Sequence, residues 1–205
     1  MQLIPTLFFD TETSDLINFK ARDTDPSQPW VVQLAAILST EERIISSMNM
    51  TIQSKGLPMS KGAQETHGIS VEFADNYGHE PEDAFNIFVT LCNKADLLVA
   101  HNKSFDFRLI AIMAKRINSK PNNLNYEVLP VLDNIKEIPS VCTMMSTTKL
   151  CQLPYPSGKA GNKWPKLTEL HMFLFGEEFD GAHDALADVM ATRRCYYELL
   201  RRGVL

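Results

Sequence analysis

Short apolar runs that end in polar or turn-forming residues recur along the chain and predict β-strands. The second and third runs flank the segment Thr40-Glu41-Glu42, which predicts a hairpin-type turn between them. The predicted strands are Thr6–Thr11, Trp30–Ser39, Arg43–Ile52, Leu97–His101 and Val141–Met144.

Apolar residues spaced three and four apart predict helices between and after these strands. The clearest helix is Glu80–Ala95, in which Phe85, Phe88 and Leu91 share one face and acidic residues occupy the first turn. In Ser104–Ile117, the first residue is the expected N-cap. The other predicted helices are Lys61–Thr66, Val71–Asn76, Lys166–Phe175 and Ala185–Arg202. Three successive strands followed by alternating strands and helices predict an α/β fold, with a mixed sheet of about five strands flanked by helices.

The composition predicts a single globular domain over residues 1–205. Of the 205 residues, 44% are hydrophobic and 22% are charged, which is enough apolar surface to build a core. No apolar run approaches the roughly 18 residues that cross a bilayer, and Met1–Phe9 lacks the basic leader of a signal peptide. The four cysteines are widely spaced, so we expect reduced thiols in a cytoplasmic protein with no membrane partner.

The net charge restricts which nucleic-acid functions are reasonable. Twenty basic and 25 acidic residues give −5 at neutral pH. Phosphate binding favours a basic face, so this balance argues against a protein that coats long nucleic acids. A protein that grips only a few nucleotides through bound metal ions is compatible with it.

Four carboxylates stand at positions where acids are costly. Asp10 follows an apolar tripeptide in the first strand, and Glu12, two residues later, leaves the same face of that strand. Asp106 lies near the start of a helix after a buried strand, and Asp188 lies beside the packed face of the last helix. Carboxylates in a dry site must be neutralised, and Mg²⁺ and Mn²⁺ prefer carboxylate and water ligands. The sequence therefore predicts a divalent-metal site.

Three segments carry a resemblance to a known family. Phe8–Thr13 (FFDTET) resembles the first motif of the DEDD superfamily of 3′–5′ exonucleases, and His101–Asp106 (HNKSFD) resembles the second. Ala182–Asp188 (AHDALAD) resembles the third motif in its histidine-bearing, DnaQ-like (DEDDh) branch. The tyrosine branch requires a tyrosine at position 184, where this chain has Asp184. The resemblance covers nearly the whole chain.

The resemblance implies a ribonuclease H-like fold and a two-metal phosphodiesterase. It implies two divalent ions, Mg²⁺ or Mn²⁺, which would bring the net charge to about −1. It also implies that His183 is the general base, reaching the site from a mobile loop, Gly176–Gly181. The implied metal ligands, which are also catalytic, are Asp10, Glu12, Asp106 and Asp188.

The same resemblance implies contacts to the terminal nucleotide, and two features depart from the family pattern. Asp15 stands where a glycine is common, and Ile17–Pro29 is longer than the family needs. The geometry at the terminal base is therefore open. The implied nucleotide-binding residues are Thr11, Thr13, Leu16, Asn102 and Phe105.

One stretch of the chain has an uneven charge. From Ile138 to Thr168 there is no Asp or Glu, and lysines alternate with aromatic residues in a loop rich in proline and glycine. Lys159, Lys163 and Trp164 are candidate contacts to single-stranded nucleic acid, through phosphate contact and stacking. The alternative is a solvated loop with Trp164 packed on the core.

The expected function is a metal-dependent 3′–5′ exonuclease that releases nucleoside 5′-monophosphates from single-stranded or frayed DNA. A DNA polymerase is a candidate partner, and proofreading is one of the roles that the sequence leaves open. The alternatives are a 3′–5′ exoribonuclease similar to oligoribonuclease or ribonuclease T, and a catalytically silent nucleic-acid-binding subunit. We favour DNA over RNA, although ribose discrimination depends on the shape of the pocket.

Overall fold

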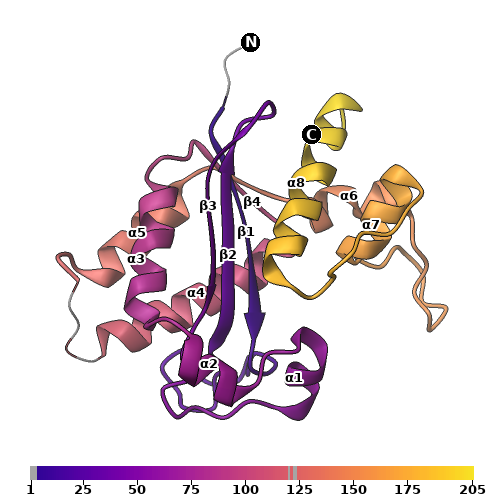
Figure 1. Ribbon diagram of the computed structural model, residues 1–205. Coiled ribbons are helices and arrows are strands. Elements are labelled where there is room, and N and C mark those ends of the chain that lie inside the picture. The colour runs from indigo at the N-terminus through magenta and orange to yellow at the C-terminus, as the bar shows by residue number, and fades with distance from the viewer. Residues whose placement is uncertain (1–3, 120, 122–123) are drawn as a thin grey trace.

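A mixed five-stranded sheet with the order β3-β2-β1-β4-β5 forms the centre of the computed structural model, which describes residues 4–119, 121 and 124–205 (Figure 1). β1 pairs with β2 and β2 with β3 in antiparallel fashion, whereas β1 with β4 and β4 with β5 are parallel. The predicted mixed α/β sheet is confirmed. The strands are β1 (Thr6–Thr13), β2 (Val31–Ser39), β3 (Ile44–Thr51), β4 (Leu97–Ala100) and β5 (Ser140–Cys142).

Helices cover both faces of the sheet, and Figure 1 shows α3, α4 and α5 on one side and α8 on the other. Side chains along β1 alternate between these two layers. Leu7 and Phe9 join the core with the first group, whereas Phe8 packs against α8, with its ring 5.4 Å from that of Tyr196. The covering helices are α3 (Pro81–Cys92), α4 (Lys103–Asn118), α5 (Val128–Glu137) and α8 (Ala185–Arg201).

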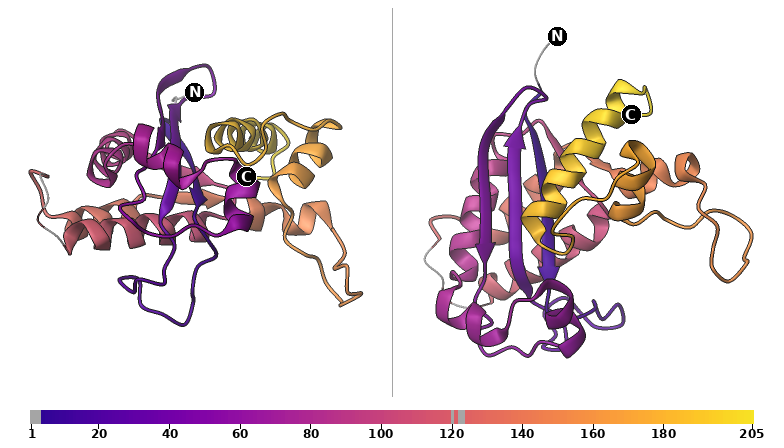
Figure 2. Two further views of the ribbon diagram at one scale, coloured as in Figure 1. Left: turned by 60° about the horizontal axis from the view of Figure 1, so that its bottom comes forward. Right: turned by 45° about the vertical axis from the view of Figure 1, so that its right-hand side comes forward.

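Four further helices lie outside the two covering layers: α1 and α2 at the bottom of the sheet in Figure 1, and α6 and α7 to its right. The short helices α1 (Lys61–His67) and α2 (Val71–Tyr77) follow β3. α6 (Thr143–Cys151) and α7 (Leu167–Phe175) pack with α8 in a separate apolar cluster. Two loops, residues 14–30 and 152–166, project beyond the helices on the same side of the molecule in the left view of Figure 2.

Two elements were absent from the sequence prediction, and two local details were wrong. Neither α5 nor α6 was expected, and the strand predicted at Val141–Met144 ends at Cys142, where α6 begins directly. Ser104 is not the N-cap of α4: the helix begins at Lys103, and its N-cap is Asn102, whose backbone is left-handed (φ 63°). Only His101 and Asn102 connect β4 to α4.

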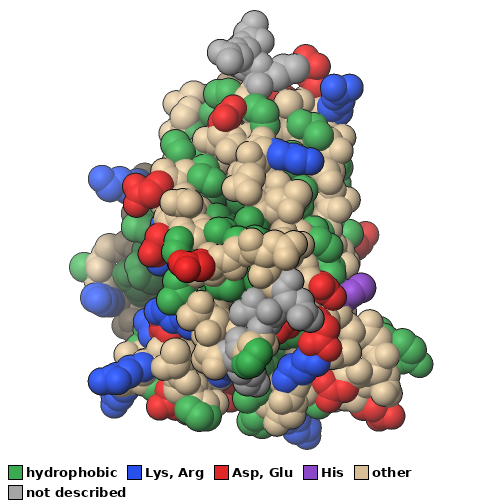
Figure 3. All heavy atoms as spheres, turned by 90° about the vertical axis from the view of Figure 1, so that its left-hand side faces the viewer, with side chains coloured by type: hydrophobic (Ala, Val, Ile, Leu, Met, Phe, Trp, Pro, Cys, Tyr) green, Lys and Arg blue, Asp and Glu red, His purple; other side chains and the backbone are tan. Residues whose placement is uncertain are grey.

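The surface and the thiols agree with the composition. On the face shown in Figure 3, acidic and basic side chains are interspersed, so this face offers no continuous basic surface for a long nucleic acid. All four cysteines are free; Cys92, Cys151 and Cys195 are buried and Cys142 is half-buried. Within the described part of the chain, no helix has both the length and the apolar character to span a membrane.

Candidate active site

The alternation of β1 directs two of the predicted acids toward α8. Asp10 and Glu12 lie on the Phe8 face of the strand, opposite Ala35 and Gln33 of β2 in the sheet register. The structure extends β1 to Thr13, two residues beyond the predicted end, so Glu12 is held within the strand. Both carboxylates therefore leave a rigid element.

The first turn of α4 supplies the third acid. Asp106 is 2% exposed, and its Oδ1 accepts hydrogen bonds from the backbone N–H of Thr11 (3.1 Å) and from its hydroxyl (2.8 Å). Thr11 faces α4 because it alternates with its neighbours along β1. A carboxylate in the first helical turn is also favoured by the helix dipole. Two hydrogen bonds thus fix Asp106 to the strand that carries Asp10 and Glu12.

The start of α8 is tied to the sheet by a polar network. Asp184 caps the helix, because its Oδ1 accepts from the N–H groups of Leu186 (3.1 Å) and Ala187 (3.0 Å). The side chain of Gln33 on β2 donates to Asp184 Oδ2 (3.0 Å) and accepts from the N–H of Ala185 (3.1 Å). The helix that carries Asp188 is therefore held in register with β2.

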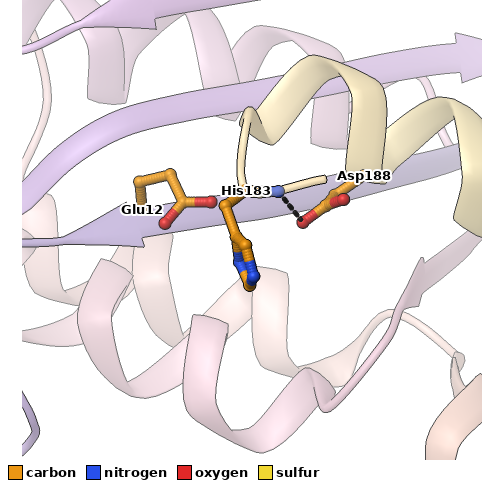
Figure 4. A group of neighbouring side chains, drawn as sticks. All are labelled: Glu12, His183 and Asp188. Carbon is orange, nitrogen blue, oxygen red and sulfur yellow. Dashed lines mark hydrogen bonds between the residues drawn. The ribbon is translucent and has the colours of Figure 1, made fainter. Parts of the chain in front are cut away.

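His183 joins the acids immediately before this cap. Its backbone is left-handed (φ 72°), and its N–H donates to Asp188 Oδ2 at 3.4 Å. A non-glycine residue in this region is strained, and such strain is concentrated at functional sites. Ligand atoms of Glu12, His183 and Asp188 all lie within 4.8 Å of one another, and Figure 4 shows His183 between Glu12 and Asp188.

The loop before His183 is anchored by contacts with His171 and turned by a glycine. His171 is buried; its Nδ1 bonds the carbonyl of Glu177 at 2.9 Å, and its ring contacts that of Phe179. Gly181 has φ 78°, and a Cβ there would come within 3.1 Å of Ala187. The expected mobility of Gly176–Gly181 is thus opposed by contacts at residues 177–179.

Burial and mutual repulsion make this cluster unfavourable as four bare anions. Burial, followed by the charges of Asp188 and Asp106, raises the pKa of Glu12 to about 8. Burial and the neighbouring carboxylates raise the pKa of Asp10 well above its ordinary value. Burial also raises the pKa of Asp106, against two Thr11 hydrogen bonds, and raises that of Asp188 to about 6. The site favours positive charge or bound protons.

These donors suit a hard divalent cation. The Oδ1 atom of Asp188 is buried without a hydrogen-bond partner, so a carboxylate oxygen is available for another ligand. Carboxylate oxygens with one imidazole nearby form the donor chemistry that Mg²⁺ and Mn²⁺ accept.

A cavity of about 420 Å³ opens directly beside Glu12. Thr13 and Leu16, both predicted to contact the nucleotide, line it together with residues of α1. His67 also lines it and is not among the residues predicted for the site.

The other predicted nucleotide contacts have different surroundings. The hydroxyl and the backbone N–H of Thr11 both donate hydrogen bonds to Asp106. Asn102 is half-buried at the turn into α4, and Phe105 is partly buried against the main core. Their roles toward a nucleotide stay predictions.

The basic loop is joined to the site region by a histidine. His101 bonds the Thr143 hydroxyl through Nδ1 (3.0 Å) and the Pro165 carbonyl through Nε2 (2.9 Å), so it holds the end of the loop against α6. Trp164, next along the chain, is 63% exposed, so the alternative that it packs on the core is wrong. The remaining lysines differ, because Lys163 is paired with Glu169, whereas Lys159 is exposed above the Tyr155 ring.

Comparison with known proteins now decides the family. A family model described as Exonuclease matches residues 7–196. The chain belongs to this exonuclease family. Membership confirms the DEDD-type resemblance and the ribonuclease H-like fold predicted from the motifs, and it identifies this exonuclease domain as a hydrolase of phosphodiester bonds.

Solved structures of exonuclease I share the fold of this exonuclease domain. One exonuclease I structure matches with a TM-score of 0.70 and 20% identity, covering 97% of this chain and 41% of its own. The structure of E. coli exonuclease I in complex with a dA16 oligonucleotide matches with a TM-score of 0.70 and 21% identity, covering 97% of this chain and 41% of its own. Product-bound exonuclease I matches with a TM-score of 0.72 and 18% identity, covering 99% of this chain and 45% of its own. The chain thus spans about two fifths of these relatives, and comparison with curated protein sequences gives no match.

Proposed function

We propose that the protein is a metal-dependent 3′–5′ exonuclease that removes nucleoside 5′-monophosphates from single-stranded or frayed DNA. The observation that carries the proposal is the cluster of four acids from β1, α4 and α8, beside His183, in a chain of the exonuclease family. A silent binding subunit would have no need to maintain such an electrostatically costly cluster.

The acids are the proposed ligands of two divalent ions, Mg²⁺ or Mn²⁺. When bound, these ions supply charge neutralisation at the scissile phosphate and at the leaving oxygen. The protein contributes rigidity, because Thr11 holds Asp106 and the capped start of α8 holds Asp188. The proposed ligands are Asp10, Glu12, Asp106 and Asp188.

His183 is the proposed general base. As the oxygen of a water molecule attacks phosphorus, the imidazole takes its proton, and the bond from phosphorus to the 3′ oxygen of the preceding nucleotide breaks. The released 3′ oxygen takes up a proton from solvent. The imidazole group exchanges protons readily at neutral pH, and the left-handed backbone of His183 brings it to the acids.

The cavity beside Glu12 is the proposed place of the terminal nucleotide. Thr13 and Leu16 line it, and we assign Asn102 and Phe105, at the start of α4, to the sugar or base of the same nucleotide. Thr11 would act at the nucleotide through its bond to Asp106. The cavity lies next to the acids, so a terminal nucleotide held in it would place its phosphate beside them.

Single-stranded DNA is the proposed substrate. Support comes from E. coli exonuclease I, whose fold this chain shares and which is known in complex with a dA16 oligonucleotide. The 152–166 loop supplies candidate contacts in Lys159 and Trp164, whereas the charge of Lys163 is compensated by Glu169. A single strand can present phosphates and bases to such a loop together.

Matched DNA and RNA strands test the proposal. We expect 5′-labelled DNA to be degraded with Mg²⁺, RNA of the same sequence to be degraded more slowly, and Asp188→Asn to lose at least about 100-fold in kcat. The control Asp133→Asn changes an exposed acid on α5 and should retain activity. Faster degradation of RNA would identify an exoribonuclease, and full activity of Asp188→Asn would remove the proposed metal site.

A further inference from the structure

The long loop between β1 and β2 is held in one shape by a buried glutamine. Gln28 is 3% exposed, and its Nε2 donates to the carbonyls of Asn18 (2.8 Å), Ala21 (3.2 Å) and Arg22 (3.3 Å). Its Oε1 accepts from the N–H of Asn18 at 3.2 Å. One side chain therefore closes the turn at residues 18–22 from inside.

The same loop is fastened to α4 from outside. Arg116 donates to the carbonyls of Pro29 (2.7 Å) and Gln28 (2.5 Å). Asp23 pairs with both Arg108 (3.2 Å) and Lys115 (2.7 Å), and these contacts lower the pKa of Asp23. A single exposed ion pair contributes little, but several bonds to one helix fix the position of the loop.

This fixed loop presents an aromatic ring to solvent. Phe19 is 74% exposed, and the guanidinium carbon of Arg108 lies 5.0 Å from its ring centroid. Because the Phe19 ring is largely exposed, it contributes little apolar burial to the fold. Packing therefore does not explain why a large apolar side chain stands at the tip of this turn. A ring backed by a cation can stack on a planar, electron-rich group.

A short stretch of chain connects Phe19 to the cavity beside Glu12. Leu16, three residues before Phe19, lines the cavity beside Glu12, and three residues span at most about 10 Å. Phe19 is therefore a candidate contact for a strand whose end lies in the cavity.

The charge around the loop favours a polyanion as the partner. The loop and the α4 side chains that contact it contain five cations and three carboxylates. The cations are Lys20, Arg22, Arg108, Lys115 and Arg116, and the carboxylates are Asp15, Asp23 and Asp25. A protein partner with an apolar patch would gain nothing from this excess of positive charge.

We propose that Phe19, backed by Arg108, is a stacking platform for a nucleobase on the 5′ side of the terminal nucleotide. The inference rests on the proposed function, and it names single-stranded nucleic acid as the ligand of this surface. In a duplex the bases stack on each other, so the platform would select unpaired strands.

Binding of a 5′-fluorescein oligothymidylate, measured by anisotropy with Ca²⁺ in place of Mg²⁺, tests the platform. Stacking on an aromatic side chain predicts that Phe19→Ala weakens binding about five- to 100-fold, while Phe19→Tyr stays within about twofold of the wild type. The control Phe173→Ala removes an exposed ring from α7 and should leave the Kd unchanged. An unchanged Kd for Phe19→Ala would overturn the proposal.

Cleavage with Mg²⁺ separates this proposal from the proposed function. The p-nitrophenyl ester of thymidine 5′-monophosphate has no upstream base, so Phe19→Ala should hydrolyse it at the wild-type kcat and KM. Equal loss on the ester and the oligonucleotide would place Phe19 in the terminal pocket and contradict the platform. A wild-type enzyme that binds the oligonucleotide through Phe19 but cleaves neither substrate would contradict the proposed function alone.

Discussion

Removing the charge of Glu12 should stabilise the metal-free protein. A carboxyl group whose pKa is raised by folding stabilises the fold below its ordinary pKa and loses that contribution as the pH rises to the folded value. For Glu12 this window runs from 4.5 to about 8. At pH 7 the lost contribution is about 3 kcal/mol, so Glu12→Gln should recover much of it.

Thermal unfolding in EDTA measures this effect. In a chain of this size, 1 kcal/mol shifts Tm by about 2–4 °C, so Glu12→Gln should raise Tm by about 5–10 °C at pH 7.5. At pH 5 the gain should fall to about 1–2 °C, because most of the repulsion is already relieved by protonation. The control Glu178→Gln, at an exposed position, should not change Tm.

Adding Mg²⁺ should reverse the order of the two proteins. The ion should raise Tm of the wild type more than that of Glu12→Gln, because the variant lacks one ligand. If Glu12→Gln lowered Tm in EDTA at pH 7.5, burial and the neighbouring carboxylates would not penalise the Glu12 charge, and the electrostatic account of the site would be refuted.

Three further changes test the parts that position the site. Asp184→Ala removes the cap of α8 and should lower the free energy of unfolding by about 1 kcal/mol, measured by denaturant titration. It should also lower kcat, because His183 directly precedes the cap. The exposed Asp180→Ala is the matched control. Gly181→Ala should lower stability by about 1–2 kcal/mol, and unchanged stability would contradict the strain at φ 78°. Charge reversal, Lys159→Glu, should raise KM for oligonucleotides at low salt, and an unchanged KM would remove the 152–166 loop from the binding surface.

Periodicity predicted the sheet because the relevant patterns are local. Alternation along β1 predicted that Asp10 and Glu12 share a face, and the structure shows that this is the α8 face. α6 was missed because its threonines have weak helix propensity, and contacts with α7 and α8 provide the stabilisation instead. α5 was missed although Val128, Leu132 and Ile135 follow a helical spacing.

The motifs predicted the acids, but the side chains that hold them could not be found in the same way. Gln33 and Asp184 are 151 positions apart, and no pattern in one chain predicts that they meet. The same is true of Phe19 and Arg108, since the loop that carries Phe19 is shaped by Gln28 and fastened to α4 by Arg116 and Asp23. Long-range polar contacts depend on the folded geometry rather than on spacing.

The most direct test of the central claim compares linear and circular single-stranded DNA. A 5′-labelled linear strand incubated with Mg²⁺ should yield a ladder that shortens from the 3′ end, while a circle of the same sequence stays intact. EDTA should stop the ladder. Cleavage of the circle, or a ladder that persists in EDTA, would contradict a metal-dependent exonuclease that acts at strand ends.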